Sequence, residues 1–315
     1  MQAVFLDKGT FSDGIDLPAP AGISDYVTYN DTPKDTDLII ERCKDADIII
    51  TNKVQIGAEV IAGLPKLKLI QLTATGMNNV DHEACDKHGV ALYNVAGYAV
   101  KSVPEHTFML MLTAMRAGIH YHQKVADGTW LANGNFCLLD IPLIDLEDKT
   151  LGIIGIGTIG KRVTEIARAF GMTVLWAEHQ GRTPRNDDYT AFDEVLARAD
   201  VLSLHCPLTE QTEHLINKDT LAKMSKQPLI VNVARGGVVD SQALTDAINN
   251  EQIIGYASDV FAQEPIANDD PLLSLSDHPR VIFSPHNAWG SKSAQETLWQ
   301  ILSKQVADFI DNQHQ

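Results

Sequence analysis

Short apolar runs alternate with segments of helical spacing along the first third of the chain. Alternating strand and helix patterns are typical of a parallel sheet with helices on its faces. The pattern therefore predicts a small α/β domain. Its strands are expected at residues 3–6, 26–29, 48–50, 69–72 and 91–93, and its helices at 37–43, 58–62 and 82–87.

A long helix is expected to follow this domain. Ser102-Val103-Pro104-Glu105 has the pattern of a capping box, with a proline early in the first turn. Phe108, Met111, Leu112 and Met115 then recur on one face and form an apolar stripe. Such a stripe can serve either as core or as the interface of a dimer.

The second half of the chain repeats the alternation of strands and helices, in the order of a Rossmann sheet. A last helical pattern, residues 291–310, comes after the final strand and is free to cross back to the first domain. The strands of this second sheet are expected at 150–154, 174–177, 201–204, 229–233, 253–258 and 281–283, with helices at 158–169 and 241–248.

A glycine-rich turn lies between the first of these strands and its helix. Gly155, Gly157 and Gly160 have the spacing G-x-G-x-x-G. In a dinucleotide-binding fold the first glycine permits the tight turn, the second lets the backbone approach a pyrophosphate, and the third lets the helix pack against the strand. The phosphates then meet the free N–H groups at the helix N-terminus, where Thr158 and Ile159 lie.

The next strand ends in a carboxylate, Glu178, roughly 20 residues beyond the glycines, a spacing typical of the acid that binds the ribose hydroxyls of NAD. Strand, turn, helix, strand and acid in this order predict a dinucleotide site. Glu178 would repel a 2′-phosphate, which favours NAD over NADP. Arg182 and Arg185 follow in the same loop and weaken that preference.

Charge and composition narrow the possible partners. The 315 residues suffice for two domains, and 44% hydrophobic with 21% charged residues is an ordinary globular composition. Lysine and arginine total 25 against 41 acidic residues, a net charge of −16, which argues against nucleic acid and anionic membranes. An anionic substrate would therefore need a local positive group.

The cysteines and the N-terminus point to the cytoplasm. Cys43, Cys85, Cys137 and Cys206 are scattered, with no Cys-x-x-Cys pair and no histidine at metal-ligand spacing. We therefore expect reduced thiols and no metal site. The N-terminus lacks the pattern of a signal peptide, and no apolar run reaches membrane-spanning length.

Three polar residues follow late strands of the second sheet, whose carboxyl ends face the ligand crevice of such folds. Arg235 can hold a carboxylate through two parallel hydrogen bonds. His286 can move a proton near neutral pH. A carboxylate such as Glu264 on its far nitrogen would favour the protonated ring and fix its orientation. Each residue alone is more often structural, but together they suggest catalysis.

These features together resemble the D-isomer-specific 2-hydroxyacid dehydrogenase family, over nearly the whole chain. The resemblance implies a Rossmann domain inserted into a flavodoxin-like α/β domain. Residues 1–100 and 289–315 would form the substrate domain, and residues 101–288 the NAD-binding domain. The motifs that carry the resemblance are 155–160, 205–209, 232–240, 259–265 and 284–286, with 75–81 and 94–98 upstream.

The resemblance also implies a role for each site residue. Arg235 would bind the substrate carboxylate and carbonyl, His286 would be the proton donor in reduction, and Glu264 would keep His286 protonated. Substrate would also meet Asn52 and the backbone at Thr75, Gly76 and Met77. Besides the glycine turn and Glu178, the residues expected to line the cofactor are Cys206, Pro207, Val233, Ala234 and Asp259, with Asp259 near the nicotinamide amide.

The segments around Asn52, Phe136–Asp140 and Ala177–Gly181 are similar to the glycerate dehydrogenase (hydroxypyruvate reductase) branch. Hydroxypyruvate or glyoxylate is the favoured substrate, and pyruvate and other short 2-oxo acids stay open. The rival hypothesis is a non-catalytic NAD-sensing module resembling C-terminal binding protein. The resemblance further implies a homodimer formed through the cofactor domain.

Overall fold

The computed structural model describes residues 1–313. The chain divides into two compact units. One is Met1–Ala99 together with the segment that begins at Trp289, and the other is Val100–Ala288. The sequence places the two crossings after residues 100 and 288, and the division in the structure falls after residues 99 and 288.

The first unit is a five-stranded parallel sheet. Its strand order is β2-β1-β3-β4-β5, which is the flavodoxin-like order. The strands are β1 (Gln2–Phe5), β2 (Asp25–Thr28), β3 (Ile48–Thr51), β4 (Leu69–Leu72) and β5 (Ala91–Tyr93), with η1 (Lys8–Thr10) after β1.

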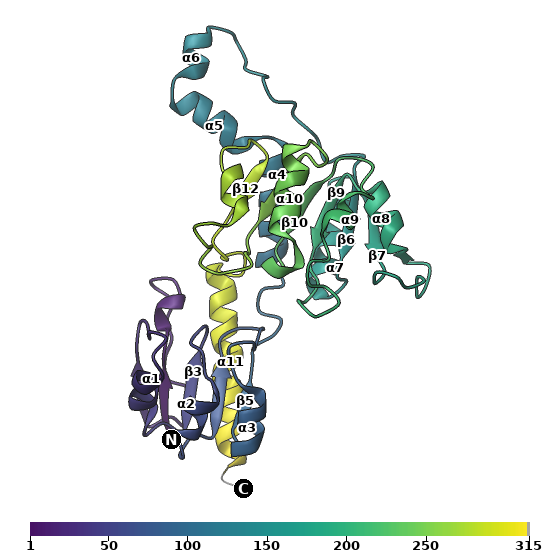
Figure 1. The fold of residues 1–315 in the computed structure, drawn as a ribbon. Coiled ribbons are helices and arrows are strands. Elements are labelled where there is room, and N and C mark those ends of the chain that lie inside the picture. Colours follow the sequence, from purple (N-terminus) through teal and green to yellow (C-terminus); the bar gives the residue numbers. More distant parts are fainter. Residues whose placement is uncertain (314–315) are drawn as a thin grey trace. The chain divides into compact units, whose positions relative to one another are not determined.

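Helices cover both faces of this sheet, because alternate strand residues point to opposite sides. On one face Val4 and Ile49 pack with α1 (Thr36–Cys43), α2 (Ala58–Ala62) and α3 (His82–His88). On the other face, Phe5, Ile48 and Ile50 pack against the last helix, α11 (Lys292–Asn312). The C-terminal helix therefore belongs to the N-terminal unit, as Figure 1 shows in yellow.

The second unit is a seven-stranded parallel sheet in the order β12-β11-β10-β9-β6-β7-β8. This is the Rossmann order with one further strand at the β12 edge. The prediction of two α/β parallel sheets is confirmed. The strands are β6 (Thr150–Ile154), β7 (Thr173–Ala177), β8 (Tyr189–Thr190), β9 (Val201–Leu204), β10 (Leu229–Asn232), β11 (Gly255–Ser258) and β12 (Val281–Phe283).

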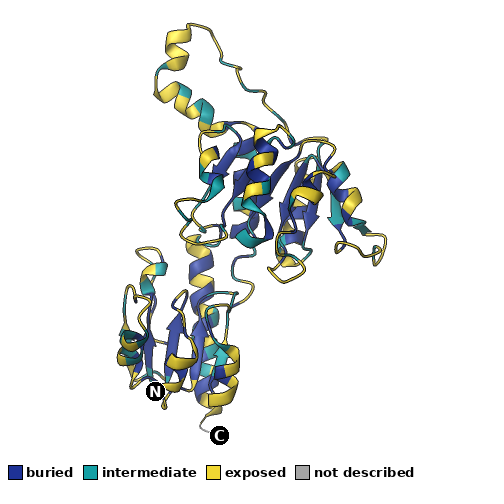
Figure 2. Ribbon diagram, viewed as in Figure 1, coloured by how far each residue is buried: buried dark blue, intermediate teal, exposed yellow. Residues whose placement is uncertain are grey.

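The interior of each sheet is buried on both faces, which Figure 2 shows as dark blue strands. One face of the second sheet packs against α4 (Ser102–Met115) and α7 (Thr158–Ala169). The opposite face packs against α8 (Phe192–Arg198), α9 (Lys218–Leu221), α10 (Ser241–Asn249) and the 3-10 turn η3 (Pro271–Leu275). A second 3-10 turn, η2 (Gly236–Val238), follows β10.

The start of α4 differs from the prediction. Ser102 is the first helical residue rather than the cap, and the cap residue Lys101 makes no side-chain capping bond. The Ser102 hydroxyl instead donates to the carbonyl oxygen of Ala288, at 2.5 Å. The predicted capping box is therefore wrong, because the helix begins at Ser102 itself and its hydroxyl bonds to a distant carbonyl oxygen rather than accepting from an N–H of the first turn.

An arm that the sequence did not predict projects from the second unit. It consists of α5 (Gly118–Ala126), α6 (Thr129–Asn133) and the irregular segment that follows, as seen at the top of Figure 1. Neither helix has a buried residue.

The apolar stripe of α4 forms part of the core, with Phe108, Met111 and Met115 packed against the second sheet. Among the described residues, no helix is long and apolar enough to cross a membrane.

Candidate active site

Three neighbouring strands end in register at one edge of the second sheet. Asn232 of β10 pairs with Ser258 of β11, and Ser258 pairs with Phe283 of β12. Parallel strands present their carboxyl ends at a common edge, where ligands bind in open α/β sheets. The loops that leave this edge carry the three residues that the sequence singles out, Arg235, Glu264 and His286.

Glu264 orients the ring of His286. Nδ1 of His286 lies 2.6 Å from Oε2 of Glu264, and the N–H of Phe261 donates to Oε1 at 3.1 Å. Because an ionised carboxylate can only accept, Nδ1 carries a hydrogen. The side chains of His286 and Glu264 stay 25% and 31% exposed, so a small molecule can reach the pair.

Arg235 sits on a loop that packs directly on the Glu264 loop. A Cβ at Gly236 would collide with the backbone of Phe261 and Ala262, so only glycine allows this approach. Behind Arg235, the buried Asn232 side chain accepts from the N–H of Ala234 at 3.0 Å and donates to the carbonyl oxygen of Arg235 at 3.0 Å. The side chain of Asn232 thus fixes the backbone of Ala234 and Arg235.

The backbone of His286 is in an unusual conformation. Its φ is 51°, in the left-handed region that favours glycine. The N–H of His286 donates to the carbonyl oxygen of Asp259 at 2.8 Å. The N–H groups of Asn287 and Ala288 donate to the Asp259 carboxylate, each at 2.9 Å. Asp259, predicted to lie near the nicotinamide amide, is 1% exposed and holds this turn.

The glycine turn has the shape that a pyrophosphate requires. Gly155 has φ 98°, and a Cβ there would lie 2.5 Å from the backbone nitrogen of Cys206. A Cβ at Gly160 would collide with the carbonyl oxygen of Gly155, whereas Gly157 faces open space at the start of α7. Phosphate oxygens can therefore approach the N–H groups at the α7 N-terminus, beside Thr158 and Ile159. These residues fit a dinucleotide.

The glycine turn also lies where the order of the strands along the sheet reverses. β6 is flanked by β7 on one side and by β9 on the other, the switch point at which such folds bind dinucleotides. Cys206 and Pro207 follow β9, and Val233 and Ala234 follow β10. Burial raises the pKa of Cys206 to about 11, so its thiol is neutral at physiological pH and acts as part of the wall.

Glu178, which the sequence predicts to bind the ribose hydroxyls, is buried and paired with Arg185. Its carboxylate accepts four N–H bonds: from the backbone of His179 (2.8 Å) and Arg185 (3.0 Å), and from Nε (2.7 Å) and Nη2 (2.5 Å) of Arg185. These bonds hold the pKa of Glu178 far below its usual value, with the Arg185 side chain as the largest cause. Arg185 also stacks over the ring of Tyr189. Sequence reasoning did not foresee that the arginine would cover the acid.

The predicted substrate residues of the first unit likewise lie at neighbouring strand ends. Asn52 follows β3, and Thr75, Gly76 and Met77 follow β4, which pairs with β3. The Thr75 hydroxyl donates to the carbonyl oxygen of Val95 at 2.9 Å.

Beneath Asn52 is a residue that the sequence analysis missed. The buried carboxylate of Asp7 accepts from the backbone N–H of Asn52, at 2.8 and 3.0 Å, and from that of Lys53, at 2.6 Å. Burial raises the pKa of Asp7, against the opposing effect of these bonds. An acidic residue directly after the first apolar strand was the available signal in the sequence.

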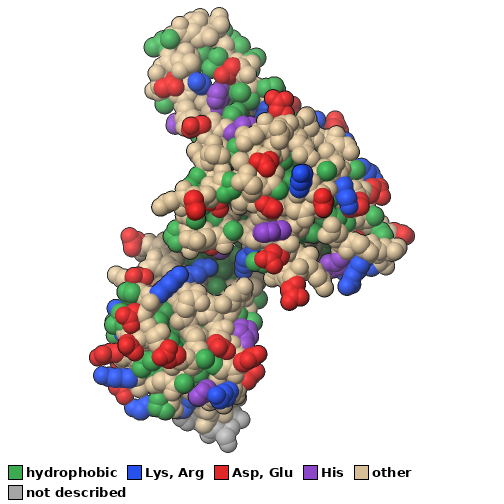
Figure 3. Space-filling view, viewed as in Figure 1, with side chains coloured by type: hydrophobic (Ala, Val, Ile, Leu, Met, Phe, Trp, Pro, Cys, Tyr) green, Lys and Arg blue, Asp and Glu red, His purple; other side chains and the backbone are tan. Residues whose placement is uncertain are grey.

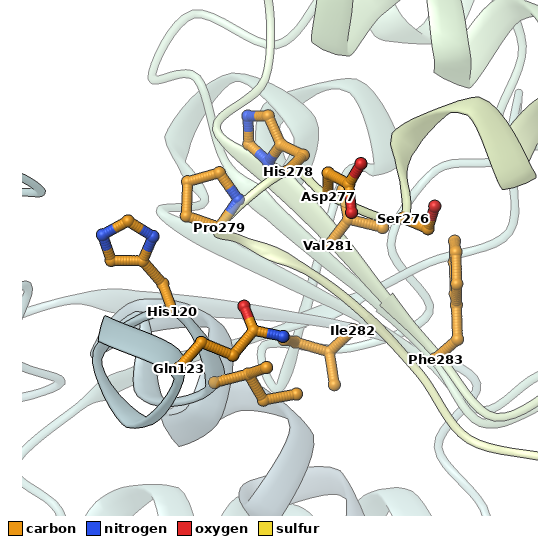
Figure 4. Close-up of a pocket in the computed structure, with 10 residues that line it drawn as sticks. His120, Gln123, Ser276, Asp277, His278, Pro279, Val281, Ile282 and Phe283 are labelled. Atoms are coloured by element: carbon orange, nitrogen blue, oxygen red, sulfur yellow. The ribbon is translucent and has the colours of Figure 1, made fainter. Parts of the chain in front are cut away.

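A cavity of about 240 Å³ lies elsewhere in the second unit, between α5 and the segment that enters β12. Figure 4 shows His120 and Gln123 on one side and Asp277, His278 and Pro279 on the other. None of the predicted site residues lines it. No group of His, Cys, Asp or Glu among residues 1–313 is arranged to hold a metal ion.

Comparison with known proteins identifies the family. Residues 108–288 match the family model described as D-isomer specific 2-hydroxyacid dehydrogenase, NAD binding domain. The chain is a member of the D-isomer-specific 2-hydroxyacid dehydrogenase family. It is thus an NAD-dependent D-2-hydroxyacid dehydrogenase, and it binds NAD(H) in its Rossmann unit.

Similar members of the family match along their whole length. A glycerate dehydrogenase of Methylorubrum extorquens is 37% identical over 98% of this chain and 95% of its own. A hydroxypyruvate reductase of Blautia hydrogenotrophica is 34% identical over 98% and 97%. The structure of a D-lactate dehydrogenase of Aquifex aeolicus, complexed with NAD and lactic acid, has a TM-score of 0.80, 28% identity and coverage of 99% and 96%.

The pairing of Glu178 with Arg185 generates a prediction about cofactor choice. Arg185→Ala frees the carboxylate to accept from the ribose hydroxyls and to repel a 2′-phosphate. We expect the ratio of the Kd for NADPH to the Kd for NADH to rise roughly tenfold. Equilibrium titration of nucleotide fluorescence measures both constants. The matched control is Arg198→Ala, which breaks the surface pair with Glu194 on α8. A ratio that stays constant in Arg185→Ala would contradict the prediction.

Proposed function

We propose that this dehydrogenase reduces hydroxypyruvate to D-glycerate, and glyoxylate to glycolate, with NADH. The observation that carries the proposal is the 2.6 Å pair of His286 and Glu264 beside the Arg235 loop. The choice of substrate is supported by relatives named glycerate dehydrogenase, hydroxypyruvate reductase and glyoxylate reductase, which are 33 to 37% identical.

The residues act through charge and position. Arg235 binds the substrate carboxylate and polarises the 2-oxo carbonyl. His286 donates the proton from Nε2 to the carbonyl oxygen as that oxygen gains negative charge, and Glu264 stabilises the imidazolium beforehand. When bound, NADH supplies the hydride to the carbonyl carbon. In oxidation of the hydroxy acid, His286 takes the proton back.

The two units take different parts in this proposal. The second unit, Val100–Ala288, is the NAD-binding domain. The residues along the cofactor are the glycine turn, Glu178, Cys206, Pro207, Val233, Ala234 and Asp259. The first unit is the substrate domain. Its backbone N–H groups at Thr75, Gly76 and Met77 would hold the carboxylate, and Asn52 would select the 3-hydroxyl of hydroxypyruvate.

Initial rates with a panel of 2-oxo acids test the substrate. We expect kcat/KM to be highest for hydroxypyruvate, lower for glyoxylate and lowest for pyruvate, because only hydroxypyruvate has a 3-hydroxyl for Asn52. Oxidation of NADH is followed by absorbance. Highest activity with pyruvate would overturn the substrate assignment. Tight binding of NADH without turnover of any 2-oxo acid would instead favour an NAD-sensing module of the C-terminal-binding-protein type.

Substitution of His286 tests the mechanism. His286→Ala is expected to lower kcat by roughly 10² to 10⁴-fold, the usual contribution of a general acid, with the Kd for NADH unchanged. Glu264→Gln should lower kcat less than His286→Ala does, because the proton donor is still present. Its kcat should still fall, since the neutral amide cannot balance the charge of the imidazolium. Stopped-flow reduction and NADH titration separate the two effects. Activity of His286→Ala within a few-fold of the native enzyme would show that another group donates the proton.

We further propose that the protein is cytoplasmic. All four cysteines are free, and three of them are buried. Free thiols are typical of proteins that stay in a reducing compartment. The net charge of −16 disfavours binding to nucleic acid, and Figure 3 shows Asp and Glu side chains spread over this face of the molecule.

The homodimer is proposed to form through the arm of the NAD-binding unit. Leu131 and Phe136 on the arm are 86% and 97% exposed, and Trp130 and Leu139 are exposed with them. The arm is nonetheless ordered, since the Tyr121 hydroxyl donates to the carbonyl oxygen of Ile141 at 2.7 Å. Large apolar side chains that gather on one projecting element are typical of a subunit interface. The stripe of α4, buried within one chain, is a poor candidate by comparison.

Paired aspartate substitutions test the arm. Leu131→Asp with Phe136→Asp should convert a dimer to a monomer, because burying two carboxylates in an apolar interface is unfavourable. Sedimentation velocity measures the mass, and circular dichroism checks that the fold is retained. A variant that sediments as the native protein does would place the interface elsewhere.

A further inference from the structure

Ser284 and His106, to which no role has yet been given, both contact the carboxylate of Asp259, which holds the His286 turn. The Ser284 hydroxyl donates to Oδ1 of Asp259 at 2.6 Å. Nε2 of His106, on α4, lies 2.8 Å from the same hydroxyl oxygen and 3.5 Å from Oδ1 of Asp259. A continuous path of hydrogen bonds therefore runs from α4 through Ser284 and Asp259 to the backbone beside His286.

The direction of these bonds follows from the number of hydrogens. The Asp259 carboxylate, when ionised, can only accept, so it takes the single hydrogen of the Ser284 hydroxyl. Ser284 must then accept from His106, which places the imidazole hydrogen on Nε2. Burial lowers the pKa of His106, against the opposing charge of Asp259. The ring is therefore neutral at physiological pH and donates one bond.

The helix at the start of this path is anchored in the core of the second unit. Phe108 and Met111, next along α4, are buried in the core beneath the sheet. One turn before His106, Ser102 donates to the carbonyl oxygen of Ala288 at 2.5 Å. The first turns of α4 thus hold the segment 284–288 at both of its ends, with His286 in the middle.

We propose that His106 and Ser284 are positioning residues for the proton donor. Through Asp259 they keep His286 in its left-handed backbone conformation, and so keep its ring against Glu264 and aimed at the substrate. This proposal rests on the proposed function of His286. Neither residue touches substrate, and both act through Asp259, whose carboxylate holds the turn.

Steady-state kinetics with hydroxypyruvate give the first test. Ser284→Ala and His106→Phe are each expected to lower kcat roughly tenfold, the effect of losing one hydrogen bond to a charged group or to the hydroxyl that serves it. KM should change little, because Arg235 still holds the carboxylate. Ser284→Thr and His106→Gln, which keep a hydroxyl and an N–H donor, should restore most of the loss.

The primary isotope effect with deuterated NADH separates positioning from simple destabilisation. A misplaced proton donor slows the chemical step, so the isotope effect on kcat should rise in Ser284→Ala. Loss of folded enzyme would lower the apparent kcat without raising the isotope effect. The matched control is Thr107→Val, which removes a buried hydroxyl from the same helix. That hydroxyl donates to the carbonyl oxygen of Val103 at 2.8 Å, within α4 itself. The Thr107→Val variant should match the native enzyme.

A double-mutant cycle tests the path itself. If His106 acts through Ser284, the double variant His106→Phe with Ser284→Ala should be no slower than Ser284→Ala alone. If the fold-decreases in kcat of the two single variants multiply in the double variant, the two residues act independently and the proposal is overturned. Native kcat in either single variant would also overturn it.

Hydrogen exchange distinguishes failure of this proposal from failure of the proposed function. The amides of residues 286–288 should exchange faster in Ser284→Ala whichever group donates the proton. Faster exchange with native kcat, in an enzyme that His286→Ala inactivates, would refute the positioning role alone. A fully active His286→Ala would refute the proposed function. Unchanged exchange in Ser284→Ala would refute the path.

Discussion

Parallel pairing of β10, β11 and β12 in one register is the constraint on which the active site depends. The pairing of Asn232, Ser258 and Phe283 fixes where the three loops leave the sheet. Gly236 further lets the backbone of the Arg235 loop lie directly on that of the Glu264 loop. The sheet thus positions the loops, and the loops carry the catalytic side chains.

In each unit a buried carboxylate orders a loop at the end of a strand. Asp7 accepts from the backbone of Asn52 and Lys53, and Asp259 accepts from the backbone of Asn287 and Ala288. A buried carboxylate is stable only when its acceptors are filled, so each one forces its neighbouring loop into a single conformation. Each unit therefore orders a strand-end loop through hydrogen bonds that leave its exposed side chains available for ligands.

Most of the secondary structure could be predicted because apolar periodicity is a local property of the chain. The strand at residues 69–72, the fingerprint strand at 150–154 and the helix at 158–169 have the predicted bounds. The Ser102 capping box is wrong, and the bond from Arg185 to Glu178 is a contact that the sequence does not foresee. In both cases the local pattern could not reveal the partner. Polar side chains take the best available partner in space, and sequence distance does not limit that choice.

The sequence by itself determined the two α/β sheets, the glycine turn and the identity of Arg235, Glu264 and His286, because spacing and residue chemistry are written along the chain. Tertiary structure decided which groups meet. It placed Glu264 2.6 Å from the His286 ring, covered Glu178 with Arg185, and brought His106 of α4 to Ser284, far along the chain. Such contacts depend on the packing of helices against the sheet, and no local pattern encodes which side chains that packing will join.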